Sequence, residues 1–173
     1  MPSAPSPAPH PSGLLRSVAS SLRRWLSPRP SGRSTTQAAP PTYPGDFTGS
    51  LHPSYSPQPD GRPDPGEIVW TWVPFEEDHR QGKDRPVLLV GRDGPWLLAL
   101  QLTSKDHDGY PSGAGRPRWV DIGAGDWDRQ RRPSEVRVDR VVRVDPKAVR
   151  REGAVLPRAR CEAVARAVSE LHR

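Results

Sequence analysis

The clearest pattern along the chain is a strict alternation of side chains in the stretch GEIVWTWV, residues 66–73. It separates two sets of three residues, which are Ile68, Trp70 and Trp72 on one side and Val69, Thr71 and Val73 on the other. Successive side chains of a β-strand point to opposite faces of a sheet, so this period of two predicts a strand. A folded domain is therefore expected to begin just before it, at about residue 63.

Two short apolar runs follow this strand and predict a hairpin. They read PVLLVG at residues 86–91 and WLLALQL at residues 96–102, with the tetrapeptide RDGP at 92–95 between them. Glycine and proline mark turns, and apolar runs of this length are typical of buried strands. The two runs are therefore expected to pair as antiparallel neighbours.

The C-terminal part of the chain continues the strand pattern and then changes period. A short strand is predicted for RWVDI, residues 118–122, after a polar loop at 105–117. The stretch EVRVDRVVRVD, residues 135–145, alternates with an interruption at Asp139 and Arg140, where a bulge or bend is expected. Residues 157–172 then repeat apolar side chains at helical spacing, and one face of the predicted helix carries Cys161, Val164, Ala165, Val168 and Leu171.

These elements together predict the fold class. Five or so short strands followed by one C-terminal helix are typical of a mainly β, α+β domain. In such a domain a small, strongly curled sheet of the SH3-like or OB-like kind is capped by the helix. Folds of this kind host many functions, so the function has to be argued from individual side chains.

Composition divides the chain at about residue 62. Hydrophobic residues make up 33% of the whole chain, and 13 of its 23 prolines lie in residues 1–62. A segment so rich in Pro and Ser buries too little apolar surface to offset the entropy lost on ordering. The sequence therefore predicts a disordered arm at 1–62, whose second half is a linker, and a folded domain at 63–173.

Within this arm, residues 13–26 (GLLRSVASSLRRWL) repeat apolar side chains at helical spacing with arginines between them. One interpretation is an amphipathic helix that contacts a membrane surface or a partner protein. The alternative is a transient helix in a disordered arm, because isolated helices this short are marginally stable in water.

Charge and cysteine content narrow the classes of function. Residues 1–62 carry six Arg and two Asp, a net charge of +4, whereas residues 63–173 carry 20 basic and 18 acidic residues, a net charge of +2. An anion site in the domain must therefore come from local placement of charge. The single cysteine, Cys161, excludes an internal disulfide and a cysteine metal cluster. Without a long apolar run or a signal-peptide pattern, a soluble, cytoplasmic protein is expected.

Candidate chemistry lies at the two ends of the predicted hairpin. The sequence contains no glycine-rich phosphate loop, no HExxH, no GxSxG and no metal-spaced histidine cluster. Antiparallel pairing places Arg85, at the start of one strand, beside Thr103, at the end of the other. Pro86 holds Arg85 in an extended conformation, and an arginine guanidinium presents a planar fork of donors that suits a phosphate.

Each candidate also has an ordinary structural interpretation. Arg85 has three carboxylates close in sequence with which it can form a salt bridge, namely Glu76, Glu77 and Asp84. Thr103 is equally an ordinary strand-end residue, and His79 is equally a solvated loop histidine. The tryptophans are explained by packing, although Trp119 and Trp127 lie next to arginines and can stack on single-stranded bases.

The stretch PGEIVWTWVPFEEDHRQGKDRPVLLVGRD, residues 65–93, resembles the opening of the PemK/MazF toxins. Those toxins begin with a G-[DE]-[IV]-[VW] strand, a loop containing Gln and Gly, an Arg-Pro pair and an aliphatic strand. Further along, LLALQLTS resembles their third strand, EVRVDRVVRVD their late strand pair, and residues 157–172 their C-terminal helix. The resemblance covers about residues 64–172.

This resemblance implies a CcdB-like, SH3-type barrel that forms a homodimer. It implies a metal-independent endoribonuclease that uses no cofactor, acts on single-stranded mRNA and is inhibited by a cognate antitoxin. Carried over by position, the catalytic residues are Arg85 and Thr103. His79 lies six residues before the arginine, as a histidine does in some members of the family.

Cleavage of RNA without a metal uses the 2′-hydroxyl of the strand to attack the adjacent phosphorus, which requires a base, an acid and a cation. We expect Arg85 to bind the phosphoryl oxygens and Thr103 to position one of them. His79 is the candidate acid or base, because imidazole has the ordinary pKa closest to neutrality. The remaining predicted RNA-binding residues flank this centre, and they are Arg80, Gln81, Lys83, Ser104, Lys105 and Trp119.

An alternative from another class is a non-catalytic SH3-like module that binds nucleic acid or a protein through the same rim. Membrane contact through residues 13–26 is a third hypothesis. Asp84 directly precedes Arg85, so it is expected either to screen the arginine or to act like an antitoxin carboxylate within the same chain. The arm is expected to tether, regulate or block the site.

Overall fold

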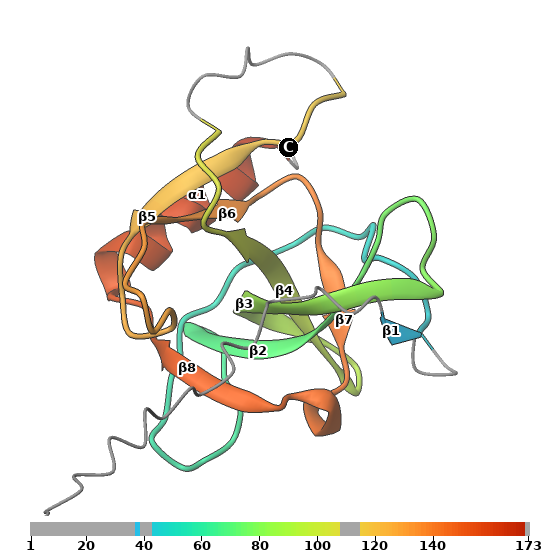
Figure 1. Cartoon of the computed structure of the whole chain (residues 1–173), viewed down its shortest axis with the longest axis horizontal. Helices are drawn as coiled ribbons and strands as arrows, with labels where there is room; N and C mark the ends of the chain where they lie inside the picture. The colour runs from blue at the N-terminus through green and yellow to red at the C-terminus, as the bar shows by residue number, and fades with distance from the viewer. Residues whose placement is uncertain (1–36, 39–42, 108–114, 172–173) are drawn as a thin grey trace, which may run out of the picture. The chain divides into compact units, whose positions relative to one another are not determined.

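A computed structural model describes residues 37–38, 43–107 and 115–171, all of which belong to one compact unit, residues 34–173. The described elements are eight strands, a short 3-10 helix and one α-helix (Figure 1). In chain order they are β1 (Gln37–Ala38), β2 (Glu67–Pro74), β3 (Gln81–Asp93), β4 (Trp96–Thr103), β5 (Trp119–Gly123), β6 (Ser134–Arg137), β7 (Val142–Val144), η1 (Pro146–Ala148), β8 (Arg151–Val155) and α1 (Arg158–Leu171). The helix predicted at 13–26 lies outside the described residues.

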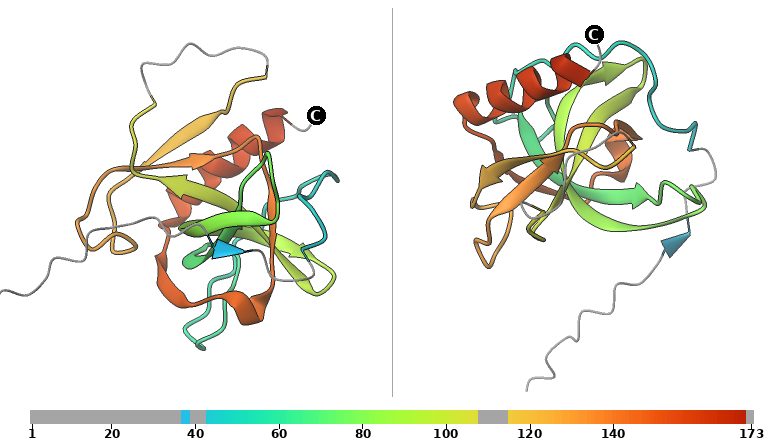
Figure 2. Two further views of the ribbon diagram at one scale, coloured as in Figure 1. Left: turned by 45° about the vertical axis from the view of Figure 1, so that its right-hand side comes forward. Right: turned by 90° about the horizontal axis from the view of Figure 1, so that it is seen from above.

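The strands form one curled sheet in the order β5-β6-β4-β3-β2-β8, with β1 paired to β3 and β7 paired to β4. Every pairing in it is antiparallel. Figures 1 and 2 show the sheet wrapping into a half-barrel, with α1 lying across one side. The predicted class, a mainly β domain with a single C-terminal helix, is confirmed.

The predicted hairpin is β3 and β4, joined by a tight turn at Asp93 and Trp96. Gly94 has φ +57 in this turn, a left-handed conformation that glycine adopts without steric cost. At the other end the last paired residues are Val87 and Gln101. Beyond that point β4 continues along β6, where Thr103 pairs with Glu135.

The two faces of the central strands bury two separate apolar clusters. On one face Ile68, Leu88 and Leu100 pack with Val164 and Val168 of α1. On the other face Val69, Val87, Leu89, Leu97 and Ala99 form a smaller cluster with residues of β7. The side chain of Arg85, one of the predicted site residues, follows Val87 on this second face at the strand period of two.

Residues 43–62 pack against the domain, so the expectation of disorder is wrong for this part of the arm. Phe47 donates its backbone N–H to the carbonyl of Val141 over 2.9 Å, and the Tyr55 hydroxyl donates to the carbonyl of Leu156 over 3.1 Å. Leu51 lies in the core beside α1. A proline-rich composition conceals these anchors, because three apolar side chains spaced four residues apart are enough to bind an extended segment.

Most of the other predicted elements are confirmed. The strand expected at 118–122 is β5, and the interruption expected at Asp139 and Arg140 separates β6 from β7. The predicted helix begins at Arg158 and buries Cys161, Val164 and Val168. The sequence did not predict β1 or β8. No helix in the described ranges is long and apolar enough to cross a membrane.

Candidate functional site

Arg85 lies half-buried on β3 with an incompletely paired guanidinium. Its Nε is buried and has no hydrogen-bond partner. Burial, followed by the charges of Arg140 and Arg137, lowers the pKa of Arg85, and Glu77 opposes them. Within the described part of the chain no carboxylate forms an ion pair with Arg85. An arginine in these surroundings is stabilised by a bound anion.

Asp84 and Glu76, two of the carboxylates that could pair with Arg85, form their salt bridges with other arginines. The Asp84 carboxylate forms its ion pair with Arg150 at 2.8 Å. Asp84 and Arg85 are successive strand residues, so their side chains leave opposite faces of the sheet. Glu76 binds Arg137 at 2.7 Å. The expectation that Asp84 screens Arg85 is therefore not supported by this geometry.

Arg137 and Arg140 are the two other members of what we call the arginine group, Arg85, Arg137 and Arg140. The Arg137 side chain is 10% exposed and also binds Asp139 at 2.8 Å. The Arg140 side chain is 5% exposed, binds Asp46 at 2.7 Å and donates to the carbonyl of Pro74 over 2.9 Å. Two members are therefore fixed and neutralised by carboxylates, whereas Arg85 is not.

Thr103 ends β4 on the same face as Arg85. Arg85 and Thr103 each lie two residues beyond the pair Val87 and Gln101, at which the β3–β4 pairing ends, so their side chains follow that pair at the strand period of two. The Thr103 hydroxyl accepts a hydrogen bond from the backbone N–H of Lys105 over 3.1 Å. Ser104 and Lys105 are exposed next to it.

His79 lies in the loop before β3, against the N-terminal segment. Its Nε2 is 3.7 Å from Asp46, its ring meets Tyr43 edge to face at 5.2 Å, and its side chain is 40% exposed. Asp46 connects His79 with Arg140, because the same carboxylate binds both. His79 thus lies near the arginine group through Asp46, and its link to Arg85 is indirect.

The pKa values in this corner follow from burial and pairing. Burial alone raises the pKa of Asp46, but hydrogen bonds from Arg140 and Tyr43, and the charge of Arg140, outweigh it and lower the pKa. Burial, together with the Asp46 carboxylate, raises the pKa of the Tyr43 phenol well above its usual range. Asp46 is therefore an anion and Tyr43 a neutral donor at physiological pH.

The predicted RNA-binding residues before the arginine divide into two kinds. Arg80 and Gln81 both bind Asp78, at 2.9 and 3.0 Å, so they are arranged around that carboxylate. Lys83 shares a face of β3 with Arg85, whose charge, followed by burial, lowers the pKa of Lys83. Lys83 therefore adds to the positive potential at Arg85.

A histidine that the sequence interpretation left in a loop is part of this face. His107 Nδ1 is 2.6 Å from Glu135 Oε2, and the backbone N–H of His107 donates to Glu135 Oε1 over 3.1 Å. The imidazole stacks on Trp119 at 4.3 Å with 5° between the planes. One face of the predicted base-stacking residue Trp119 is thus covered by His107. The one indication in the sequence that His107 lies near the site was its position four residues after Thr103.

Trp127 has an ordinary packing role. It is buried, and its indole N–H donates to the hydroxyl of Ser134 over 3.1 Å. Its backbone carbonyl accepts from the indole of Trp70, also over 3.1 Å. The alternative in which Trp127 stacks on bases is excluded by this burial.

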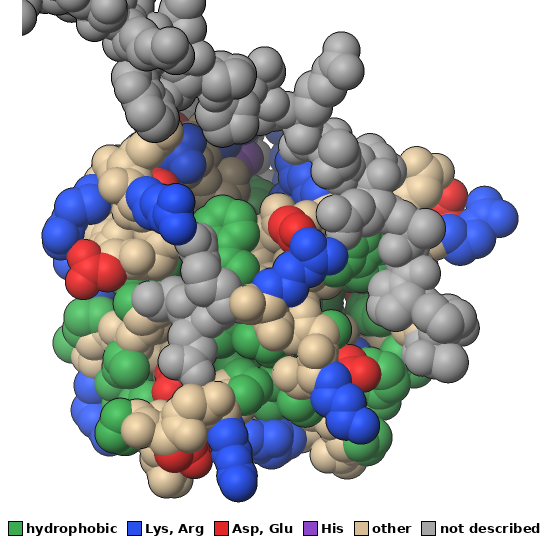
Figure 3. All heavy atoms as spheres, turned by 60° about the horizontal axis from the view of Figure 1, so that its bottom comes forward, with side chains coloured by type: hydrophobic (Ala, Val, Ile, Leu, Met, Phe, Trp, Pro, Cys, Tyr) green, Lys and Arg blue, Asp and Glu red, His purple; other side chains and the backbone are tan. Residues whose placement is uncertain are grey.

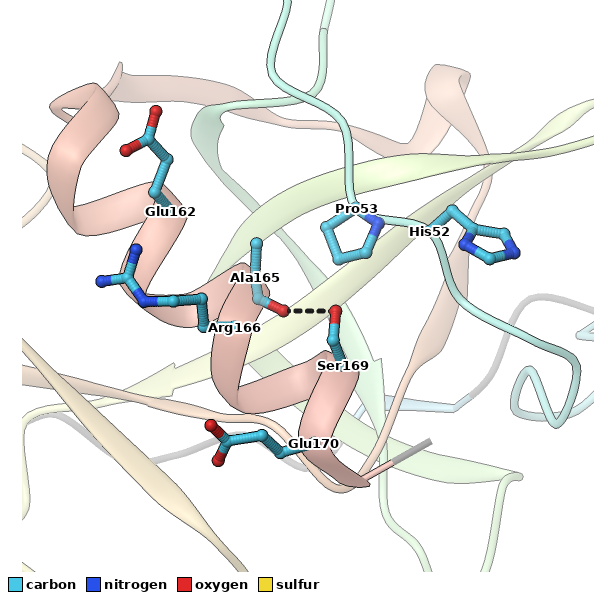
Figure 4. A pocket seen from close by; sticks show the side chains of 7 residues that line it. All are labelled: His52, Pro53, Glu162, Ala165, Arg166, Ser169 and Glu170. Carbon is cyan, nitrogen blue, oxygen red and sulfur yellow. Dashed lines mark hydrogen bonds between the residues drawn. The ribbon is translucent and has the colours of Figure 1, made fainter. Parts of the chain in front are cut away.

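The surface of the described part of the chain carries mixed charge, and a hollow lies beside the helix. On the face drawn in Figure 3, Lys and Arg side chains are interspersed with Asp and Glu around hydrophobic side chains. An open pocket of about 530 Å³ lies between His52 and Pro53 on one side and α1 on the other (Figure 4). Its lining residues on α1 are Glu162, Ala165, Arg166, Ser169 and Glu170. None of them belongs to the arginine group, so the pocket and the candidate site are separate.

Comparison with known proteins places the chain in a family. Among the described residues no group of three or more His, Cys, Asp or Glu side chains is arranged to hold a metal ion. No curated protein sequence matches the chain. The family model described as PemK-like, MazF-like toxin of type II toxin-antitoxin system matches residues 64–172, and the chain belongs to this toxin family.

Proposed function

We propose that the protein is a toxin-like endoribonuclease that cleaves single-stranded mRNA without a metal ion. Membership of the toxin family supports a nuclease in general. The observation that supports this site is Arg85, a half-buried cation with an unpartnered Nε beside two further arginines. A phosphate offers the negative charge and the acceptor oxygens that such a group lacks.

The proposed reaction uses the 2′-hydroxyl of the substrate as nucleophile. Its oxygen attacks the adjacent phosphorus, the bond to the 5′-oxygen breaks, and a 2′,3′-cyclic phosphate and a 5′-hydroxyl form. Arg85 stabilises the charge that develops on the phosphoryl oxygens. The Thr103 hydroxyl positions one of these oxygens, and His79 is the candidate base for the 2′-hydroxyl proton.

Substrate binding along the strand rests on the residues around this centre. Lys83 and Lys105 would hold the phosphates on either side, with Ser104 and Gln81 as polar contacts and Arg80 further out. Contacts of this kind position the strand and carry no sequence information. The need for a 2′-hydroxyl makes RNA the substrate and excludes DNA.

The test is cleavage of a long single-stranded RNA by purified protein in EDTA, with Arg85→Ala and Arg85→Lys as variants. We expect discrete fragments ending in 2′,3′-cyclic phosphate, and a rate at least about 100-fold lower for Arg85→Ala, a typical loss for one transition-state donor. Arg85→Lys should recover little of it, because an ammonium group lacks the bidentate fork. The matched control is Arg92→Ala, which removes an exposed arginine at the opposite end of the same strand.

Two results would contradict the proposal. Cleavage that is unaffected by Arg85→Ala would remove Arg85 from the mechanism. A shift of RNA mobility without any fragments would favour the non-catalytic binding module.

Partners follow from the same proposal. A type II toxin is paired with an antitoxin, and an acidic segment is the partner chemistry that the arginine group fits. We further propose a homodimer that acts in the cytoplasm, where mRNA is found. Sedimentation of the purified chain at several concentrations tests the oligomeric state.

A further inference from the structure

We propose that His107 is the general acid of the reaction and that Glu135 and Trp119 hold it in place. This inference rests on the proposed RNA cleavage and assigns the proton that the leaving 5′-oxygen requires. It is carried by three contacts: the 2.6 Å contact of His107 Nδ1 with Glu135, the 3.1 Å hydrogen bond from the His107 backbone, and the stack on Trp119.

The contacts fix both the position and the tautomer of the imidazole. Glu135 is buried within β6, and an ionised carboxylate accepts hydrogen bonds only, so Nδ1 carries a proton toward it. The nitrogen that gains and loses a proton is then Nε2. The same carboxylate holds the orientation of the ring, as a buried carboxylate does for the histidine of a hydrolase triad.

Strand register places this pair beside the proposed catalytic residues. Glu135 is the backbone partner of Thr103, so the two side chains leave the same face of neighbouring strands. Trp119 is likewise the partner of Arg137, two residues along β6 from Glu135. Arg137 in turn acts on the charge of Arg85. Glu135 and Arg137, which are neighbours on one face of β6, thus connect His107 with the arginine group.

His107 differs from His79 in how it is held. The His79 imidazole lies 3.7 Å from its carboxylate and is 40% exposed, whereas that of His107 is 2.6 Å from its carboxylate and 18% exposed. Efficient proton transfer depends on a fixed donor within hydrogen-bond reach of the reacting oxygen. The more firmly positioned histidine is therefore assigned to the leaving group, and His79 stays the candidate base.

The proton balance is complete without another reactant. The 2′-oxygen bonds to phosphorus and gives its proton to the base, while the bond from phosphorus to the 5′-oxygen breaks. Protonated His107 gives its Nε2 proton to that oxygen, which leaves as a hydroxyl. The neutral imidazole then regains a proton from water.

The experiment compares two substrates that differ only at the leaving atom. After the cleavage site has been mapped with the wild-type protein in EDTA, a short RNA with that site is made with a bridging 5′-oxygen or a bridging 5′-sulfur. A thiolate leaves without being protonated, so it does not need a general acid. Single-turnover rates are measured for the wild-type protein, His107→Gln, Glu135→Gln and the control His52→Gln, which alters the separate pocket on α1.

We expect His107→Gln to lose about 100-fold or more with the oxygen substrate, in the range of general acid catalysis, and to cleave the sulfur substrate at nearly the wild-type rate. Glu135→Gln keeps the shape of the side chain and should show a smaller loss with the same rescue, which makes Glu135 a positioning residue. His52→Gln should match the wild-type protein on both substrates.

Three results would overturn the assignment. An equal loss of cleavage rate on both substrates in His107→Gln and Glu135→Gln would mean that His107 has a structural role or acts as a base. An unchanged rate with the oxygen substrate would mean that His107 takes no part in the reaction. Because the Glu135→Gln comparison has its own rescue, it decides the question if His107→Gln does not fold. Failure of the wild-type protein to cut any RNA would instead overturn the proposed function as well, so the two failures are distinguishable.

Discussion

Asp46 and Arg140 form a 2.7 Å ion pair that joins the segment before the family match to the arginine group. Asp46 also accepts a hydrogen bond from Tyr43 and lies 3.7 Å from His79. The Asp46 carboxylate therefore occupies the hydrogen-bonding site of the Arg140 guanidinium, which would otherwise suit a phosphate oxygen or an acidic partner. The N-terminal segment accordingly supplies the negative charge that pairs with a buried arginine of the domain.

Replacing Asp46 with Asn should lower the free energy of unfolding by about 2 kcal/mol at pH 7, because buried Arg140 loses a charged hydrogen-bond partner. In the folded protein the pKa of Asp46 lies below its ordinary value of 3.8. Between these two pKa values the native chain therefore binds fewer protons than the unfolded chain. The difference between wild type and Asp46→Asn is thus full above pH 3.8 and disappears as the pH falls through the lowered pKa.

Urea unfolding at pH 7, 5 and 3 measures this effect. The control is Asp126→Asn, which removes a largely exposed ion pair with Arg131 and should change stability by less than about 1 kcal/mol. A constant difference between wild type and Asp46→Asn at every pH would contradict the ionic explanation.

Truncation should separate the packed part of the arm from the rest. A chain that starts at residue 63 loses Phe47, Leu51 and Tyr55 from the core beside α1, which should cost about 3 kcal/mol or more. A chain that starts at residue 43 retains these contacts and should unfold at nearly the same temperature as the full chain. Thermal unfolding followed by circular dichroism compares the three, and equal midpoints would show that residues 43–62 contribute nothing.

Gly82→Ala should disturb the start of β3. A Cβ atom at this position would lie 2.4 Å from the carbonyl oxygen of Val73 and 2.5 Å from the Trp72 ring, so backbone has to move. We expect a loss of about 2 kcal/mol, typical of overpacking, and weaker RNA cleavage because Arg85 lies three residues further on.

The matched control is Gly91→Ala on the same strand, where the nearest atom is at an ordinary 3.8 Å. Chemical unfolding of both variants, with the cleavage rate measured in parallel, makes the comparison. Equal stability of Gly82→Ala and Gly91→Ala would mean that β3 tolerates the shift.

Cys161 should react slowly with thiol reagents in the native protein. Burial of this α1 residue in the core raises the pKa of its thiol, so less thiolate is present at neutral pH, and the thiolate is the reactive form. Labelling by a chromogenic disulfide at pH 8 should be slow in buffer and fast in denaturant. Fast native labelling would show that α1 separates readily from the sheet.

The sequence was informative where a pattern is local. Alternation located β2, and two apolar runs separated by a turn located the hairpin, because each depends on neighbouring residues and on one buried face. The hairpin register relates Arg85 to Thr103, since each lies two residues beyond the last β3–β4 pair, but their placement at one catalytic rim stays a prediction.

Long-range relationships were not visible in the sequence. His107 and Glu135 are 28 residues apart and meet only because β4 pairs with β6. Asp46 and Arg140 are 94 residues apart, and no spacing rule connects them. The sequence also placed Asp84 beside Arg85, whereas the pleat of the strand sends it to Arg150.

The strand β4 pairs with β3, β6 and β7. This eight-residue element ends in Thr103, the proposed hydroxyl, and it lies beside the strand of Arg85, the proposed phosphate ligand, and beside the strand of Glu135, which contacts the proposed proton donor His107. Buried side chains such as Leu100 and Leu102 fix β4 from behind, against the helix. The positions of the proposed site residues therefore depend on how the core packs beneath β4. Substitutions beneath β4 are expected to reach the RNA through the backbone, and to impair cleavage before the domain itself unfolds.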